Sequence, residues 1–381
     1  MNISLTPRFL TLVVSLVLIA GACAGSAGEV ASTTAPAVAL SEQPEPHDGE
    51  HSHDGDEDHS TDIEAASGTG LDLALFFPGS LTEEATTEPC TLSGGVETTC
   101  YRITVAGDPV TYDTGPFCPA TITDTAEAGG IWLDGNDVYD VDGAFIAGLA
   151  ELYDDPNWQM FDEDGNVNIT ETAEEFDLAA RPDVDPSLQN HCVEGRLEWL
   201  DNGEPISSTV LIPTAPVLAD GVAEYRGNLG VTLDGVVIAQ PAPVDAILSA
   251  YTIAAFDDCG GHYNPNDGYH LHGATGCSEA GEAGEGETSI FAYAIDGFAV
   301  HSPLDDAADL DECNGHKTEE LGYHYHANGA EQNLVIQCLI GQTAINNADA
   351  GSGGAGGGAG GGAGGGRGER GERLGPPPGD G

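Results

Sequence analysis

One fifteen-residue pattern occurs twice in this chain. Residues 258–272 read DCGGHYNPNDGYHLH, and residues 312–326 read ECNGHKTEELGYHYH. Both fit Asp/Glu-Cys-x-Gly-His-x5-Gly-Tyr-His-x-His without a gap. Upstream of them, LDGVVI at 233–238 matches IDGFAV at 295–300. We interpret this as an internal repeat of a strand, a turn and a His-rich strand, with copies at about 229–277 and 291–338.

Each copy holds a His-x-His pair and a third histidine eight positions upstream. Side chains alternate between the faces of a strand, so the two members of each pair share a face, with Cα atoms about 6.5 Å apart. Both rings can then reach one metal ion at about 2.0–2.1 Å, and the intervening loop can bring the third ring beside them. The candidate ligands are His262, His270, His272, His316, His324 and His326.

Metal binding is favoured over simple hydrogen bonding because six histidines repeat one spacing in two copies. Imidazole suits both copper and zinc, and the pattern does not choose between them. The sequence does not decide whether the two copies form one shared metal site or two separate sites. His301 is a further candidate ligand, with a surface side chain as the alternative.

Nine cysteines occur, and Cys23 is considered separately below. An even number of the rest, in an exported chain, indicates a disulfide framework. Two pairs bracket the two histidine motifs, and the other two follow by elimination. The expected bonds are Cys259–Cys277, Cys313–Cys338, Cys90–Cys100 and Cys118–Cys192.

The N-terminus is typical of an export signal. Arg8 precedes the apolar run FLTLVVSLVLIA, which is shorter than the ~20 residues of a membrane-spanning helix. Residues 19–23, IAGAC, resemble a bacterial lipoprotein signal, in which Cys23 would be lipidated and become the mature N-terminus. Simple secretion is the alternative. Either reading places the mature protein in the cell envelope, outside the cytoplasm.

The formal net charge of −55, with only nine Lys and Arg, argues against nucleic-acid binding. It also opposes electrostatic docking on anionic lipid, so the lipid anchor is the one expected membrane contact. So many carboxylates with few cations suggest a saline setting, bound divalent cations, or both.

The chain divides by composition into a signal peptide at 1–22, an acidic His-rich tether at 23–70, a β-rich part at 71–225, the duplicated domain at 226–345, and a Gly/Ala-rich tail at 346–381. Whether the β-rich part is continuous with the duplicated domain is left open by the sequence. Short apolar stretches between Gly, Pro, Asn and Asp turns predict a mainly β fold with many short strands, and helical spacing occurs near 143–153.

Residues 323–326, Tyr-His-Tyr-His, resemble the motif after which the YHYH domain family is named. The Gly-His turns at 261–262 and 315–316 and the Ile-Asp-Gly-Phe stretch at 295–298 are also similar to that family. The resemblance covers about residues 225–345. The first copy departs from it, because Leu271 stands where the motif has its second tyrosine. The resemblance implies a domain rather than an activity.

A calcium loop is a weaker hypothesis for residues 160–171. Asp162, Asp164, Asn168 and Glu171 fall at loop positions that carry ligands. Met160 stands where the first acidic ligand belongs, so an acidic turn is the favoured reading.

Three functions follow, in order of preference. The first is an envelope protein that binds copper or zinc through the two His-x-His motifs. The second is a metal-dependent oxidoreductase or hydrolase, with open coordination positions that activate water or oxygen. The third is a calcium-dependent adhesion or structural module in which the histidines only pack.

Overall fold

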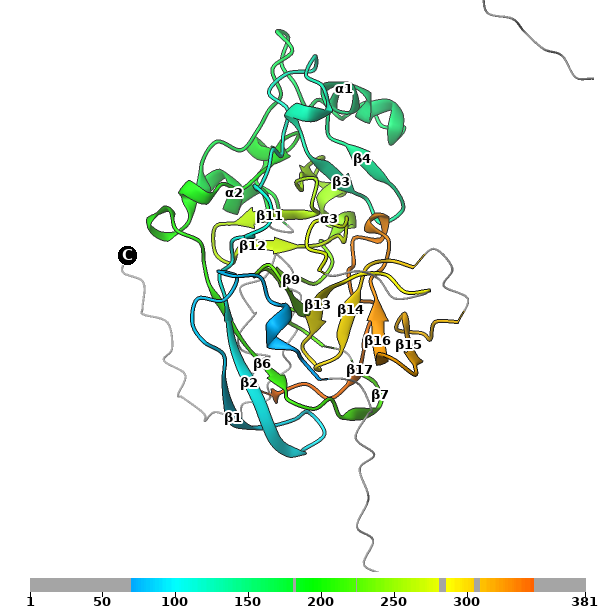
Figure 1. Ribbon diagram of the computed structural model, residues 1–381. Helices are drawn as coiled ribbons and strands as arrows, with labels where there is room; N and C mark the ends of the chain where they lie inside the picture. Colours follow the sequence, from blue (N-terminus) through cyan, green and yellow to red (C-terminus); the bar gives the residue numbers. More distant parts are fainter. Residues whose placement is uncertain (1–69, 181–182, 224, 281–285, 305–308, 346–381) are drawn as a thin grey trace, which may run out of the picture. The chain divides into compact units, whose positions relative to one another are not determined.

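Eight short strands form the largest sheet of the molecule. The computed structural model describes residues 70–345 except 181–182, 224, 281–285 and 305–308, so the expected signal peptide, Cys23, tether and tail lie outside it. In spatial order the strands are β11 (Gly261–Asn264), β12 (Gly268–Leu271), β9 (Val237–Ile238), β8 (Gly230–Thr232), β13 (Ile290–Ala294), β14 (Ala299–His301), β16 (Gly322–His326) and β15 (Gly315–Thr318) (Figure 1).

The two halves of this sheet have the same strand order and directions. Strands β8 and β13 pair antiparallel at the centre. Outward from β8, the pairs are antiparallel to β9, parallel to β12 and antiparallel to β11. Outward from β13, the same three pairings join β14, β16 and β15. This pairing is what a duplication would produce, and the duplication stays an interpretation of the repeated motif.

Glycines determine the tight turns within each half. Gly235 and Gly297, in the Asp-Gly turns, have φ values of 99° and 96°. Gly268 and Gly322, which open the His-rich strands, have φ values of 78° and 69°. Residues with a Cβ rarely adopt this left-handed conformation, so these positions require glycine.

Smaller sheets and short helices make up the rest, which confirms the mainly β fold. The other strands are β1 (Thr86–Thr91), β2 (Glu97–Val105), β3 (Ile131–Leu133), β4 (Val138–Asp140), β5 (Cys192–Val193), β6 (Ser208–Pro213), β7 (Leu218–Ala223), β10 (Ile253–Ala254) and β17 (Leu339–Gly341). They pair as β1-β2-β6, β3-β4, β5-β10 and β7-β17.

Three α-helices are described: α1 (Gly143–Leu152), α2 (Ala173–Ala179) and α3 (Val244–Ser249). Helix α1 is the one expected near 143–153, and Asp142 caps it by accepting a hydrogen bond from the amide of Phe145. The 3₁₀ helices are η1 (Leu73–Leu75), η2 (Ala126–Ala128), η3 (Pro186–Leu188), η4 (Leu197–Trp199), η5 (Asp201–Gly203) and η6 (Ala330–Gln332). None of these helices is both long and apolar enough to cross a bilayer.

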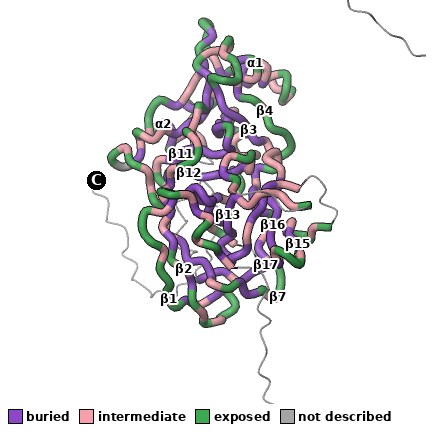
Figure 2. Tube along the Cα trace, viewed as in Figure 1, coloured by how far each residue is buried: buried purple, intermediate pink, exposed green. Residues whose placement is uncertain are grey.

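The two outer hairpins of the main sheet are covered unequally. Residues from the first part of the chain, among them Phe117 and Trp132, share a hydrophobic core with Tyr263 and Tyr269 of the β11–β12 hairpin. All four residues of β11 are buried, whereas β15 keeps an exposed Lys317 and half-buried neighbours (Figure 2). The first hairpin is therefore interior, and the second lies at the surface.

Four disulfides staple the described residues. They join Cys90 to Cys100, Cys118 to Cys192, Cys259 to Cys277, and Cys313 to Cys338, which are the four pairs that the sequence analysis gives. Two of them hold the histidine hairpins. The Cys118–Cys192 bond closes the longest loop, with a sequence separation of 74 residues.

Removing the Cys118–Cys192 bond is expected to destabilise the fold most. In the chain-entropy treatment, a loop of 74 residues contributes about 4.4 kcal/mol and the 10-residue loop of Cys90–Cys100 about 2.7 kcal/mol. All four cysteines are buried, so the Cys90→Ala/Cys100→Ala variant is a matched control for Cys118→Ala/Cys192→Ala. Urea denaturation measures the free energy of unfolding of both variants. An equal loss of unfolding free energy in the two variants would contradict this account.

Candidate metal centres

The register of each histidine hairpin places imidazoles directly opposite each other. His262 pairs with His270 in β11–β12, and His316 pairs with His324 in β15–β16. Opposite residues of an antiparallel pair project on the same face. Their Nε2 atoms are 3.1 Å apart in the first hairpin and 3.0 Å apart in the second. Each hairpin therefore brings its histidines together on one face, as the sequence predicts.

In the second hairpin, a carboxylate completes a four-residue cluster. The Oε2 atom of Glu287 lies 3.4 Å from Nε2 of His316, 3.2 Å from that of His324 and 3.3 Å from that of His326. The Nε2 atoms of His316 and His326 are 3.3 Å apart. We call these four residues the surface cluster; they could hold a metal ion.

The spacing of these atoms fits a tetrahedral ion. Four ligand atoms at 2.0–2.1 Å from one tetrahedral centre lie roughly 3.3–3.4 Å from each other. Five of the six separations in the surface cluster are between 3.0 and 3.4 Å. A square-planar ion would separate two opposite pairs of ligands by about 4 Å, which five such short distances do not permit.

Backbone carbonyls orient two of these rings. Nδ1 of His324 lies 3.1 Å from the carbonyl of Gly322, and Nδ1 of His326 lies 3.1 Å from the carbonyl of Ser302. A ring that donates its Nδ1–H to a carbonyl keeps the Nε2 lone pair free for a metal. Burial lowers the pKa of His324 and of His326. Both rings are then neutral near pH 7, which is the form that binds metals.

Glu287 is acidic in this setting. Burial by itself would raise its pKa, but the hydrogen bond with His324 and the electrostatic interaction with the three neighbouring imidazoles lower it overall. The side chain is 10% exposed. Glu287 therefore adds one negative charge to the surface cluster.

His301 lies beside the surface cluster rather than in it. Its ring centroid is 4.7 Å from that of His324, and its Nδ1 lies 2.6 Å from the carbonyl of Thr288. Burial lowers its pKa to about 4. Among the described residues, the group that could share one ion is Glu287 with the three hairpin histidines. His301 as a direct ligand stays a prediction.

The surface cluster borders a cavity of about 590 Å³. Glu287, His301 and His324 form part of its wall. Its other described walls combine apolar side chains such as Leu75 and Tyr293 with carboxylates such as Glu320. A small molecule in this cavity would therefore lie next to the cluster.

The first hairpin forms a different group, which we call the interior cluster. It consists of His262, His270 and His272, which are 7%, 4% and 1% exposed. The ring of Phe256 lies 5.0 Å from that of His262 and 5.1 Å from that of His272, between centroids. The ring of Trp132 stacks on that of Phe256. The cluster thus has an aromatic cover and no carboxylate among the described residues within ligand distance.

Burial dominates the electrostatics of the interior cluster. It lowers the pKa of His270 to about 4 and those of His262 and His272 well below the ordinary value. Nδ1 of His262 and Nε2 of His272 are buried without a hydrogen-bond partner among the described residues. Unpartnered buried nitrogens cost free energy, and an ion held between the three rings would give Nε2 of His272 a partner.

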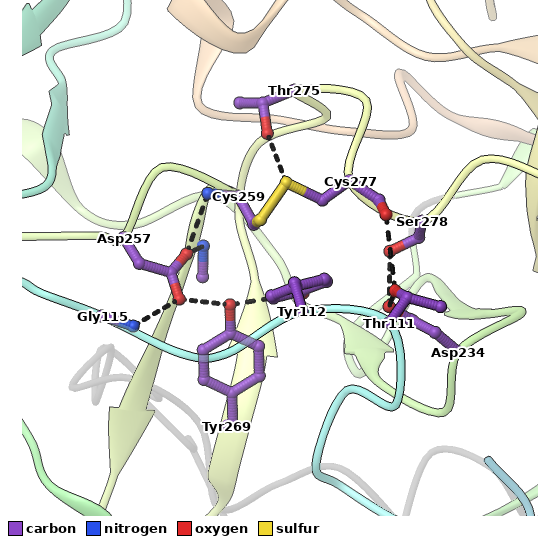
Figure 3. Close-up of a disulfide and its surroundings, with 11 residues drawn as sticks. Thr111, Tyr112, Gly115, Asp234, Asp257, Cys259, Tyr269, Thr275, Cys277 and Ser278 are labelled. Carbon is purple, nitrogen blue, oxygen red and sulfur yellow. Dashed lines mark hydrogen bonds between the residues drawn. A yellow bond between two sulfur atoms is a disulfide. The ribbon is translucent and has the colours of Figure 1, made fainter. Parts of the chain in front are cut away.

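The motif tyrosines occupy the opposite face of each hairpin, where carboxylates accept their hydroxyls. The hydroxyl of Tyr269 donates to Asp257 over 2.7 Å, beside the Cys259–Cys277 disulfide (Figure 3). In the second copy, Tyr323 donates to Asp311 over 2.8 Å and Tyr325 to Asp296 over 2.6 Å. Asp296 is completely buried, and burial raises its pKa to about 6.

The proposed calcium residues are not gathered around one point. Asp162 accepts hydrogen bonds from the amides of Asp164 and Asn166, as in an acidic turn. The side-chain amide of Asn168 donates to the carbonyls of Gln159 and Asn190. Glu171 joins neither metal-ligand group of the described residues.

Sequence reasoning missed Glu287. It lies in a Gly- and Glu-rich stretch, GEAGEGETS, in which no spacing singles out one carboxylate. The first copy has Tyr225 at the corresponding position, so the repeat does not mark it either. The pairing of β13 with β14 and of β14 with β16 places the end of this stretch next to β16.

The fold and the two clusters define a disulfide-stapled, mainly β protein with two histidine groups that could hold metal ions. The model of the YHYH protein family matches residues 209–310, so this part of the chain is similar to that family. The matched segment includes the first histidine motif and ends before the second. No curated protein and no solved structure matches the chain.

Replacing Tyr325 by Phe is expected to destabilise the fold by about 1–3 kcal/mol. The change leaves Asp296 without its hydroxyl donor and the amide of Ile340 without an acceptor, both in the interior. Tyr323→Phe is the matched control, because its bond to the exposed Asp311 can be replaced by water. Urea denaturation measures the free energy of unfolding of both variants. A larger loss of unfolding free energy in Tyr323→Phe than in Tyr325→Phe would contradict this assignment.

Proposed function

We propose that this protein binds a divalent transition metal ion through Glu287, His316, His324 and His326. The observation that carries the proposal is the near-equal spacing of the Glu287 oxygen and the three imidazole nitrogens, at 3.0–3.4 Å. Four lone pairs directed at one point repel one another unless a cation or protons lie between them. Burial lowers the pKa of His324 and of His326, so a cation is favoured over protons at this point.

Zinc is the ion that suits this cluster best. Zinc takes tetrahedral nitrogen and oxygen ligands, and one carboxylate reduces the charge of the complex to +1. Copper(II) prefers a tetragonal arrangement, which would require the four ligand atoms to spread. Copper remains the alternative ion, since imidazole binds both metals.

A metal-dependent enzyme is the second candidate, and the adjacent cavity favours it. A zinc ion with four protein ligands can accept a fifth ligand during a reaction. The cavity of about 590 Å³ is within the usual size range of small-molecule sites and includes Glu287 and His324 in its wall. A hydrolase or an oxidoreductase would each use such an arrangement. Turnover of a small substrate that is lost with the metal would separate this function from storage or transport.

We also propose that the mature protein is exported and anchored by a lipid on Cys23. The basic start, the short apolar run and the small residues before this cysteine support the anchor. The disulfides are consistent with an oxidising compartment. The histidine clusters would then encounter metal ions outside the cytoplasm.

Glu287→Gln is expected to weaken zinc binding at the surface cluster about 100-fold or more. The amide keeps the shape of the side chain but removes the charge that offsets the ion, and loss of a ligand exceeds the 10–100-fold effect of outer partners. Glu320→Gln is the control, because Glu320 lines the same cavity outside the cluster. Competition with a chromophoric chelator measures the affinities. Equal zinc affinity in Glu287→Gln and the unchanged protein would refute the site.

Cys23→Ser is expected to release the protein from the membrane fraction. A serine cannot carry the thioether-linked lipid, so the exported chain would lose its anchor while its fold is unaffected. Incorporation of a labelled fatty acid and cell fractionation measure the change. No label in the unchanged protein, together with its absence from the membrane fraction, would favour simple secretion, and membrane association that persists in Cys23→Ser would contradict a lipid on Cys23 as the anchor.

A further inference from the structure

The two histidine clusters share a register but differ in three physical properties. The interior cluster is almost completely buried, whereas His316 and Glu287 in the surface cluster are 18% and 10% exposed at their side chains. The surface cluster includes a carboxylate, and the interior cluster includes none among the described residues. The surface cluster borders a cavity, whereas the described lining of that cavity includes none of the three interior histidines.

The charge of a bound ion matters most in the interior cluster. An imidazole ligand brings no charge to the ion it binds, so a divalent ion held by these three rings would remain a buried +2 charge, while a monovalent ion would remain +1. Burying net charge in a low-dielectric interior is costly, and the cost rises steeply with the charge.

Asp257, which precedes β11 in the chain, does not supply the missing negative charge in an available form. Its carboxylate already accepts hydrogen bonds from Tyr269 and from three backbone amides (Figure 3). Burial also raises its pKa, which favours the neutral acid.

The presence of only three histidine ligands in the interior cluster also favours an ion other than zinc. Zinc in proteins is almost always four-coordinate, with water as the fourth ligand where the protein gives three. Here the aromatic ring of Phe256 lies about 5 Å from two of the imidazoles and leaves an apolar surface beside them. An apolar cover gives a bound water no hydrogen-bond partner. An ion that accepts three ligands and needs no water suits this environment.

We infer that His262, His270 and His272 form a three-coordinate site for monovalent copper, distinct from the divalent site of the surface cluster. Copper(I) has a filled d shell, binds three imidazoles readily and carries the smallest charge of the ions that imidazole binds well. The Nε2 atoms of His262 and His270 are 3.1 Å apart, against roughly 3.5 Å for three nitrogens 2.0 Å from one ion in their plane. Small ring movements supply the difference.

This inference rests on the proposed function only in that both treat the duplicated histidines as metal ligands. It adds that one chain discriminates two ions with nearly the same three imidazoles. The burial of the first hairpin and the presence of Glu287 in the second are what separate them. A copper(I) ion in the interior cluster would also be shielded from bulk water by the burial of its three ligands.

The test uses the full chain with the tether substitutions His47→Ala, His51→Ala, His53→Ala and His59→Ala, which remove four other histidines that could chelate a metal ion. Copper(I) is supplied anaerobically as its acetonitrile complex, without thiols, so that the disulfides stay intact. Bicinchoninate competes for copper(I), and zinc is titrated separately. Two matched variants, His272→Phe and His326→Phe, change equivalent positions of the two copies.

We expect one equivalent of copper(I) with three nitrogen ligands at the copper absorption edge. His272→Phe should weaken copper(I) binding by about 100-fold or more and leave zinc binding unchanged, whereas His326→Phe should do the reverse. Retained zinc binding in His272→Phe also shows that this variant is folded. The coordination number of copper(I) is measured in the protein with both clusters intact, so it tests the inference even if a variant does not fold.

Three results would overturn the inference: no copper(I) retained against bicinchoninate, copper(I) with four ligands, or an equal loss in His326→Phe. If zinc still binds the surface cluster in those cases, the proposed function stands and only this inference fails. If neither ion binds either cluster, both fail.

Discussion

The direct pairing of two histidines across a short hairpin is the constraint on which the candidate sites depend. His262 faces His270, and His316 faces His324, with Nε2 atoms about 3 Å apart in each hairpin. A slip of one residue would turn every side chain to the other face and separate these rings. The same register places Tyr269, Tyr323 and Tyr325 on the opposite face, where carboxylates accept their hydroxyls. The tyrosines thus hold the register that the histidines need.

One register with two different surroundings gives two different sites. The first part of the chain packs its aromatic residues over the β11–β12 hairpin, so the interior cluster has an apolar cover. The β15–β16 hairpin forms the other edge of the sheet, and the end of a Gly- and Glu-rich stretch lies beside it instead. Coverage, not the motif, is therefore what distinguishes the two clusters.

Much of this arrangement can be predicted from the sequence because it is local. The alternation of side chains along a strand predicts that His270 and His272 share a face, and bracketing cysteines predict the disulfides of the hairpins. Helical spacing and the capping Asp142 mark α1. The antiparallel pairing of β8 with β13 and the position of Glu287 depend on contacts between distant segments, and no local pattern carries that information. The unequal burial of the two histidine hairpins could not be predicted from the sequence for the same reason.

The acidity of the chain also explains why Glu287 differs from the other buried carboxylates. With nine Lys and Arg against 64 Asp and Glu, few carboxylates can pair with a basic side chain. Asp234, Asp257 and Asp296 are fully buried and accept hydrogen bonds from hydroxyls or backbone amides, as neutral or ionised acids can. The partners of Glu287 are instead three imidazole nitrogens, and burial lowers the pKa of two of these rings, His324 and His326. A cation at the centre of this group would offset the charge of Glu287, as proposed above.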